Sequence, residues 1–389
     1  MTRTRKPIMA AITLLLLLCA SAWPADSPSF DIDWYGYVKL DASYDQNLTS
    51  HGNFAMWVQP QSADQNTDEQ FNMTHKQTRF GAALKGVGYS DVDLGGNIEF
   101  DLYGSGGAEN KALLLLRHAF FSLDHRSMQL VAGQTWDLVA PLNPATLNYP
   151  VLWGCGNAGY RRPQIRFTFN GELSPNTNVK VASGIFRTIG SDLTPTLTLS
   201  TEVSDGSDDG TDAGMPTVQG LVDFTHKSAS GVSLRAGVSG LWGRLKAEGT
   251  LGSNENYTSQ GVFGHFQASF GNFGFAGEAF SGTNLGGYNA GINNANTIDG
   301  VDAVGGWGYL WFKPHTQWTL AAGGGMDDPD DNDLATNARC KNQAFFGNVK
   351  FSPVPLFTVG FEVSQWETSY KDTDTAENLR AQTSFVINF

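Results

Sequence analysis

The alternation of short and long links between β-patterned segments is the feature that most limits the fold of this chain. From Asp33 to Phe389 the 389-residue sequence contains about sixteen such segments. The long links, rich in Gly, Asn and Asp, fall at 46–75, 104–111, 136–159, 188–215, 244–257, 283–302, 326–340 and 368–377. The short links fall near Gly86–Asp93, His125–Ser127, Gly171–Pro175, Ser228–Ser230, Gly271, Pro314–His315 and Pro353. Bacterial outer-membrane barrels have an even number of antiparallel strands, short periplasmic turns and long extracellular loops.

The segments also carry two distinct faces. Residues 358–363 place Val359, Phe361 and Val363 on one face and Thr358, Gly360 and Glu362 on the other. A soluble β-sandwich or solenoid shows the same alternation, but the polar face here is too polar for a dry core. The final segment 382–389 alternates to a terminal Phe389, as outer-membrane barrels do. We therefore predict an all-β transmembrane antiparallel β-barrel of about 16 strands, whose width leaves an aqueous channel.

The N-terminus reads as a signal peptide. Arg3, Arg5 and Lys6 precede an apolar run that ends in Ala20-Ser21-Ala22, so we expect cleavage after residue 22. An uncleaved anchor helix, which needs about 20 apolar residues, is the alternative. No linker or change in composition divides residues 23–389, which we interpret as one outer-membrane barrel domain of a Gram-negative bacterium. Its expected surroundings are the lipid bilayer and lipopolysaccharide.

Charge and cysteine content narrow the function further. The chain has 25 basic and 38 acidic residues; losing three basic residues with the signal peptide leaves 22 against 38, a net charge of −16. Such an acidic chain is not expected to bind nucleic acid. Cys155 and Cys340 lie in the third and seventh long links of an exported protein, so a disulfide between them and two free thiols are both compatible with the sequence.

Basic residues fall on the polar face of the strands, which must face the lumen. Strand parity places ten of them there: Lys39, Arg79, Lys85, Arg117, Arg162, Arg166, Lys180, Arg235, Lys350 and Arg380. Fewer acids share that face, and most acids lie in the long links. Rings of Arg or Lys make anion-selective pores, and a guanidinium holds a carboxylate bidentately. The alternative is that these cations only form structural pairs with Glu99 and Asp101.

One long link differs in composition from the other seven. Residues 136–159 are apolar and contain three prolines. We expect this link to fold inward and to narrow the channel opposite the arginines. Its constriction residues are predicted to be Trp136, Asp137, Asn143 and Tyr149.

The remaining chemical signals are weak. Asp208, Asp209, Asp330 and Asp331 resemble hard-cation ligands, but neither acidic run ends in the Glu of a calcium loop, so we expect hydrated loops and no cofactor. We expect no catalytic residues. A barrel enzyme such as a lipid hydrolase would need a nucleophile near a His at the lipid-facing rim, where His118 is a poor candidate. A loop-mediated adhesin is the other alternative.

Several motifs resemble the DcaP-like porins. They are Lys76-Gln77-Thr78-Arg79-Phe80-Gly81, Arg117-His118-Ala119-Phe120, Ala132-Gly133-Gln134-Thr135-Trp136-Asp137, Asn143-Pro144 and Arg161-Arg162-Pro163-Gln164-Ile165-Arg166. The resemblance implies a sixteen-stranded trimeric porin that passes small anionic organic acids past arginines at a constriction. We expect this chain to lack the helical periplasmic extension that fuller members carry before the first strand.

We therefore expect a passive diffusion channel of the outer membrane. It would form a homotrimer and prefer small anionic solutes such as carboxylates. Arg79, Arg117, Arg162 and Arg166 would set the selectivity, with Lys39, Lys85 and Lys180 along the path.

Overall fold

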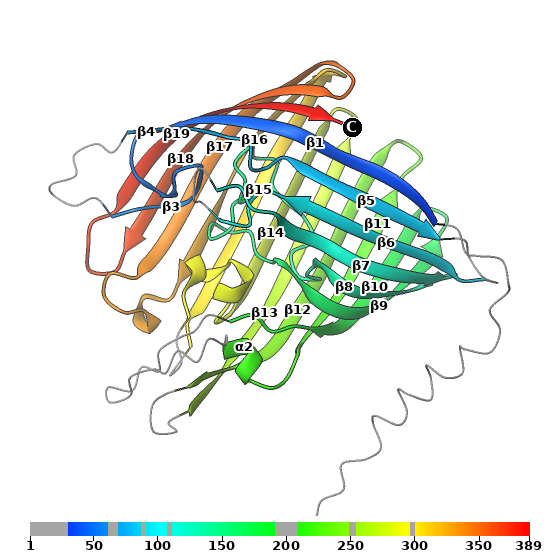
Figure 1. Cartoon of the computed structure of the whole chain (residues 1–389), viewed down its shortest axis with the longest axis horizontal. Coiled ribbons are helices and arrows are strands. Elements are labelled where there is room, and N and C mark those ends of the chain that lie inside the picture. Colours follow the sequence, from blue (N-terminus) through cyan, green and yellow to red (C-terminus); the bar gives the residue numbers. More distant parts are fainter. Residues whose placement is uncertain are drawn as a thin grey trace, which may run out of the picture.

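The chain forms a closed antiparallel β-barrel (Figure 1). The computed structural model describes residues 30–60, 69–86, 91–106, 111–190, 209–248, 254–295 and 300–389. The expected signal peptide, residues 1–22, lies outside these ranges. The strands are β1 (Phe30–Asp45), β2 (Thr49–His51), β3 (Phe54–Val58), β4 (Gln70–Thr74), β5 (Arg79–Gly86), β6 (Asp93–Asp101), β7 (Leu115–His125), β8 (Met128–Trp136), β9 (Arg161–Ser174), β10 (Thr177–Phe186), β11 (Thr217–Lys227), β12 (Val232–Glu248), β13 (Asn254–Phe270), β14 (Phe273–Thr283), β15 (Asp302–His315), β16 (Trp318–Pro329), β17 (Arg339–Val354), β18 (Phe357–Tyr370) and β19 (Ala376–Asn388).

Sixteen strands form the barrel wall in the described part of the chain. Each strand pairs with its neighbour in sequence, and β1 also pairs with β19, which closes the sheet. β4 and β5 both pair with β1 and are two halves of one strand. The backbone of Phe389 completes the seam by exchanging two hydrogen bonds with Gly36, at 3.0 and 3.1 Å. The predicted fold class and strand number are confirmed.

Alternation along the strands separates a lipid-facing surface from the lumen. Phe167, Val262 and Leu310 are 65%, 67% and 63% exposed on the outside, whereas polar residues such as Glu362 and Arg380 are buried inside. The alternation of short turns and long loops is also confirmed. Three turns lie slightly later than predicted, at residues 175–176, 316–317 and 355–356. Pro314 and Pro353, which were predicted to lie in two of these turns, instead lie near the ends of strands β15 and β17.

A β-bulge explains why the sequence pattern is ambiguous around residues 113–124. Glu99 on β6 pairs with His118 on β7, while the next residue, Phe100, pairs with Leu116, so Arg117 is an extra residue on β7. A bulge inserts one residue without a partner and re-aims side chains. As a result Arg117 and His118, although consecutive, both reach Glu99 in the barrel interior.

The helical content of the described residues is small. It consists of α2 (Asp209–Asp212) and the 3-10 turns η2 (Gly286–Tyr288), η3 (Gly291–Asn293) and η4 (Asp331–Asp333). No helix in the described ranges is long and apolar enough to cross a membrane.

In the described ranges, parts of three long loops, rather than one, fold into the barrel. Residues of the segment 137–160, in the third link, bond to interior side chains of β14, β16 and β18. The β2–β3 hairpin of the first link also folds inward, where Phe54 packs on Tyr103 and Tyr149. The turns η2 and η3 of the sixth link pack from the other side, and the Tyr288 carbonyl accepts a hydrogen bond from the Gly159 amide at 2.7 Å. The expectation that one link alone differs from the other seven is therefore wrong, because small apolar segments within two other links also find partners inside the barrel.

Candidate functional site: a lumen narrowed by an anchored loop

Buried carboxylates of the barrel wall hold the inward loop, residues 137–160. Glu278 on β14 accepts a hydrogen bond from the Leu142 amide at 2.7 Å. Glu362 on β18 accepts one from the Leu147 amide at 2.7 Å, and Asp327 on β16 accepts one from the Gly156 amide at 2.6 Å. Hydrogen bonds from backbone amides to carboxylates are stronger than neutral ones. The loop is thus fixed at three points around the lumen.

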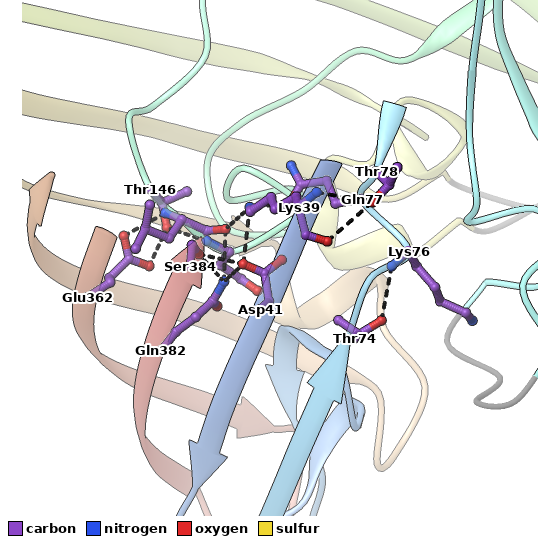
Figure 2. Close-up of polar contacts among 12 residues, drawn as sticks. Lys39, Asp41, Thr74, Lys76, Gln77, Thr78, Thr146, Glu362, Gln382 and Ser384 are labelled. Atoms are coloured by element: carbon purple, nitrogen blue, oxygen red, sulfur yellow. Dashed lines mark hydrogen bonds and ion pairs between the residues drawn. The ribbon is translucent and has the colours of Figure 1, made fainter. Parts of the chain in front are cut away.

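A second group of contacts ties the loop to the barrel seam (Figure 2). Lys39 on β1 pairs with Asp41 at 3.3 Å and donates to the Leu147 carbonyl at 3.3 Å. Gln77 also accepts a hydrogen bond from Lys39. These partners bury the ammonium group, so Lys39 supports the loop instead of facing the open channel.

The interruption between β4 and β5 gives the motif Lys76-Gln77-Thr78-Arg79 its role in the fold. At this break the Thr78 hydroxyl takes the place of a backbone partner for Lys39. It accepts a hydrogen bond from the Lys39 amide at 3.1 Å and donates one to the Lys39 carbonyl at 3.2 Å (Figure 2). The Lys76 ammonium donates to the Gly106 carbonyl at 2.9 Å. The break in the strand therefore lets Thr78 bond to β1 and Lys76 bond to the segment that contains Gly106.

Arg117, Arg79 and two carboxylates form one cluster on β5–β7. Arg117 lies 2.7 Å from both Glu99 and Asp101, and its side chain is buried. Arg79 lies 3.4 Å from Glu99 and stacks over Tyr37, with 21% of its side chain exposed. The structure thus brings the two arginines together, with Arg79 the more accessible to solutes.

Arg161, which strand parity does not place in the lumen, lies beside this cluster and shares the Trp136 ring with Arg117. Its guanidinium is 4.6 Å from the Trp136 ring, 4.5 Å from the Tyr160 ring and 6.0 Å from the Trp153 ring. The residue is 2% exposed, and its Nη1 and Nη2 atoms have no hydrogen-bond partner among the described residues. Strand parity missed Arg161 because it begins β9, where the chain leaves the loop; the preceding Tyr160 was the available signal.

Arg162 fastens the loop and is remote from solvent. Its Nε lies 2.8 Å from Asp137, its Nη2 donates to the Gly287 carbonyl at 3.1 Å, and its guanidinium lies 3.9 Å from the Tyr288 ring. The side chain is 0% exposed. The structure therefore does not place Arg162 in the open channel with Arg79.

Arg166, Lys180 and Arg235 follow the lumen side of β9, β10 and β12. Arg166 donates to the Trp136 carbonyl and to Gln164, both at 3.3 Å, and its Nε has no partner. Neither Arg166 nor Lys180 has an acidic partner in the described ranges. Arg235, in contrast, lies 2.8 Å from Asp223. The accessible cations without a counter-charge on this wall are thus Arg166 and Lys180.

Three further residues that were predicted to lie along the channel, Lys85, Tyr149 and Asn143, occupy different parts of the barrel. Lys85 lies at the short-turn end, exposed, 2.5 Å from Asp33. Tyr149 stacks on Tyr103 with ring centroids 3.8 Å apart, and burial raises the pKa of its hydroxyl. Asn143 accepts a hydrogen bond from Asn157 at 3.3 Å within the loop.

The remaining weak signals gain little from the structure. Asp208 lies outside the described residues, and Asp209 begins α2. Asp330 accepts hydrogen bonds from Asn332 at the start of η4, and no group of His, Cys, Asp or Glu in the described ranges could hold a metal ion. The His118 ring lies in the interior, 3.0 Å from the Thr135 hydroxyl, and not at the lipid-facing rim.

Cys155 and Cys340, the two cysteines in the described ranges, are free. Cys155 lies in the inward loop, 3.2 Å from the Gly325 carbonyl, and Cys340 is the second residue of β17. Burial raises the pKa of the Cys155 thiol well above its ordinary value. Of the two alternatives compatible with the sequence, the structure has two thiols.

Solved structures of outer-membrane channels share this architecture. The outer membrane channel DcaP of Acinetobacter baumannii superposes with a TM-score of 0.71 at 21% identity, covering 93% of this chain and 98% of DcaP. This chain has the fold of DcaP. An anion-selective porin from Comamonas acidovorans (TM-score 0.56, 11% identity, 93% and 100% covered) and the trimer form of OmpT of Vibrio cholerae (0.53, 10%, 93% and 100%) are also similar.

The resemblance to DcaP-like porins, first seen in short motifs, is thus confirmed in the fold. No family model matches the sequence, and no curated protein matches it. A closed barrel with an apolar outer surface and a polar lumen places the chain in the outer membrane of a Gram-negative bacterium.

Proposed function

We propose that this protein is a passive outer-membrane diffusion channel that prefers small organic anions, in particular carboxylates. A solute would pass the anchored loop along the wall that carries Arg79, Arg166 and Lys180. The anion preference would come from these cations, and the loop would limit the size of the solute.

Within the described part of the chain, neither Arg166 nor Lys180 forms an ion pair with an acidic side chain, and this observation carries the proposal. Both side chains are half-buried in the lumen, where a paired cation would contribute little net potential. Low-dielectric walls focus the field of an unpaired charge, which raises the local concentration of counter-ions. Anions would therefore accumulate at this wall although the chain as a whole is acidic.

The cluster of arginines and carboxylates on β5–β7, together with Arg161, also favours anions. Arg79, Arg117 and Arg161 face only Glu99 and Asp101 there, so the cluster holds one more arginine than carboxylates. Asp137, the acid of the inward loop, is occupied by Arg162 and Gln219, at 2.8 and 2.7 Å. No acidic side chain of the loop is thus left to attract cations across the constriction.

A homotrimer is the assembly that we propose. The DcaP-like motifs imply it, and OmpT of Vibrio cholerae, which shares the fold, has a trimer form. Chemical cross-linking of the detergent-solubilised protein, followed by gel electrophoresis with and without heating, tests this assembly. A ladder that ends at three chains is expected, and a species that remains at one chain contradicts it.

Liposome swelling tests the channel function. Proteoliposomes should swell in acetate or succinate faster than in a neutral sugar of similar size, and the rate should fall as solutes become larger. A barrel enzyme or an adhesin would give no size-limited swelling. Equal rates for size-matched anions, cations and neutral solutes would retain the channel and reject its anion preference.

A further inference from the structure

An aromatic surface lines the lumen of β15. Trp307, Tyr309 and Trp311 alternate along this strand on the inward face. The Trp307 and Tyr309 rings are stacked with centroids 6.0 Å apart, and those of Tyr309 and Trp311 lie 5.3 Å apart. Trp307 is buried and donates from its indole to Glu278, the residue that also anchors the loop. Tyr309 and Trp311 are half-buried and lie on the short-turn side of that anchor.

The neighbouring strands keep the Trp311 indole uncovered. Trp311 pairs with Gly274 on β14 and with Ala321 on β16. A Cβ atom at Gly274 would lie 1.9 Å from the indole, so only glycine lets the ring lie over the backbone of β14. Ala321 on the other side adds a single methyl group. The small neighbours thus leave the aromatic surface accessible from the lumen.

Cations flank the aromatic surface on both sides. Arg235 lies in the same lateral row as Tyr309, since Arg235 pairs with Gln267, Gln267 with Ala276, and Ala276 with Tyr309. Three strand spacings of about 4.8 Å separate the two backbones, about 14 Å along the wall. In the opposite direction, Lys350 lies on β17, two strands beyond Trp311.

Lys350 has spare capacity for an anion. Its ammonium donates to the Ala145 carbonyl of the inward loop at 3.1 Å, and a lysine ammonium has three donors. The row of Trp311 reaches Asn348 through Ala321, so Lys350 lies two residues away from it along β17. Two strand spacings and this offset correspond to about 12 Å between backbones, which the lysine and indole side chains largely span. A ring placed on Trp311 could therefore present a carboxylate to Lys350.

From these observations we propose that Tyr309 and Trp311 form a binding surface for planar organic anions, in which a conjugated ring stacks on the indole while its carboxylate is held by Lys350 or Arg235. This inference rests on the proposed anion channel and names its preferred solute class as aromatic carboxylates. Aromatic pairs gain enough from ring contact to favour a flat ring over a saturated one about three- to tenfold.

Current block in planar bilayers tests the proposal. Benzoate and cyclohexanecarboxylate carry the same charge and have nearly the same size, but only benzoate is flat. In the wild-type trimer, benzoate should reduce the KCl current at about three- to tenfold lower concentration than cyclohexanecarboxylate. The W311L variant should lose this difference, while its ion selectivity in a KCl gradient stays unchanged.

Trp318 supplies the matched control. It lies on the outer face of β16, stacked on Phe351 with ring centroids 4.3 Å apart, so W318L should retain the benzoate preference. If W311L fails to migrate as a folded barrel, G274V gives the same test, because its side chain displaces the indole without removing it. W311F, which keeps a flat ring, should block almost as the wild type does.

Three results would overturn the proposal. They are equal block by the two carboxylates in the wild type, an unchanged benzoate preference in both W311L and G274V, and equal block by benzoate and the neutral benzamide or glucose. Failure of the anion channel itself has a separate signature, since the wild type would then show no anion selectivity in the KCl gradient.

Discussion

Replacing Lys180 by glutamate tests whether unpaired lumen cations set the ion selectivity. Lys180 is half-buried on β10 and has no acidic partner among the described residues. Its register partner Asp223 is already engaged by Arg235 and His265, at 2.8 and 3.1 Å. The K180E change therefore reverses a charge that forms no ion pair in the described part of the wall.

Coulomb's law gives the size of the expected effect. An ion that passes about 7 Å from a unit charge in water experiences about 0.6 kcal/mol, and screening over a Debye length of about 10 Å at 0.1 M salt halves this energy. Reversal changes the site by two charges, so an anion loses about 0.6 kcal/mol and a cation gains as much. The combined 1.2 kcal/mol corresponds to a change of about eightfold in the anion-to-cation permeability ratio.

The assay is the reversal potential of the protein reconstituted in a planar bilayer, under a tenfold KCl gradient. K180E should move this potential toward the value for cations, R166E should do the same, and the effect should shrink as the total salt rises. The matched control is R126E, since Arg126 lies in the exposed turn between β7 and β8 and pairs with Asp91 at 3.0 Å. Permeability ratios that stay within twofold of the wild type in both lumen variants would refute the reasoning.

Three further predictions concern the inward loop. E362A should lower the free energy of unfolding by about 2–4 kcal/mol and increase current noise, because the Leu147 amide loses its acceptor; thermal melting and single-channel recordings measure both effects, and an unaltered melting curve contradicts the anchor. R162M should cost about 3–5 kcal/mol by leaving Asp137 buried and unpaired, and adding D137N should restore much of this stability in the same melting assay; a double variant as unstable as R162M argues against the pair. With the other cysteine replaced by serine, Cys155 should react with maleimide only after unfolding, and rapid labelling of the folded barrel would contradict its burial.

The barrel itself could be predicted from the sequence because each local signal had a single physical cause. Period-2 alternation reflects strands with one face in lipid and the other in water, and a one-residue shift would expose charges to lipid. The alternating link lengths reflect turns that need only close a hairpin on one side. The same parity placed Arg79, Arg166 and Lys180 in the lumen without any knowledge of their partners.

Parity failed where the backbone departs from a regular strand. The bulge at Arg117 lets Arg117 and His118 both reach the interior. Arg161 begins β9, and its guanidinium lies against aromatic rings in the interior. The ion-pair partners of the lumen cations could not be predicted from strand parity either. Arg162, for example, contacts Asp137 and Gly287, which lie in segments distant from it in the sequence. Linear spacing gives no information about which cation finds a carboxylate and which remains free.

The sequence by itself determined the closed barrel, its orientation and the presence of basic side chains in its lumen, because these follow from local alternation and from the cost of exposing polar groups to lipid. Only the tertiary structure decided which cations are accessible. Arg162 and Lys39 became anchors of the inward loop, while Arg166 and Lys180 kept no counter-charge among the described residues. The physical reason is that the long loops contact the barrel wall across the lumen. Glu278, Asp327 and Glu362 accept hydrogen bonds from backbone amides of the inward loop, and no local sequence pattern predicts which amide meets which carboxylate.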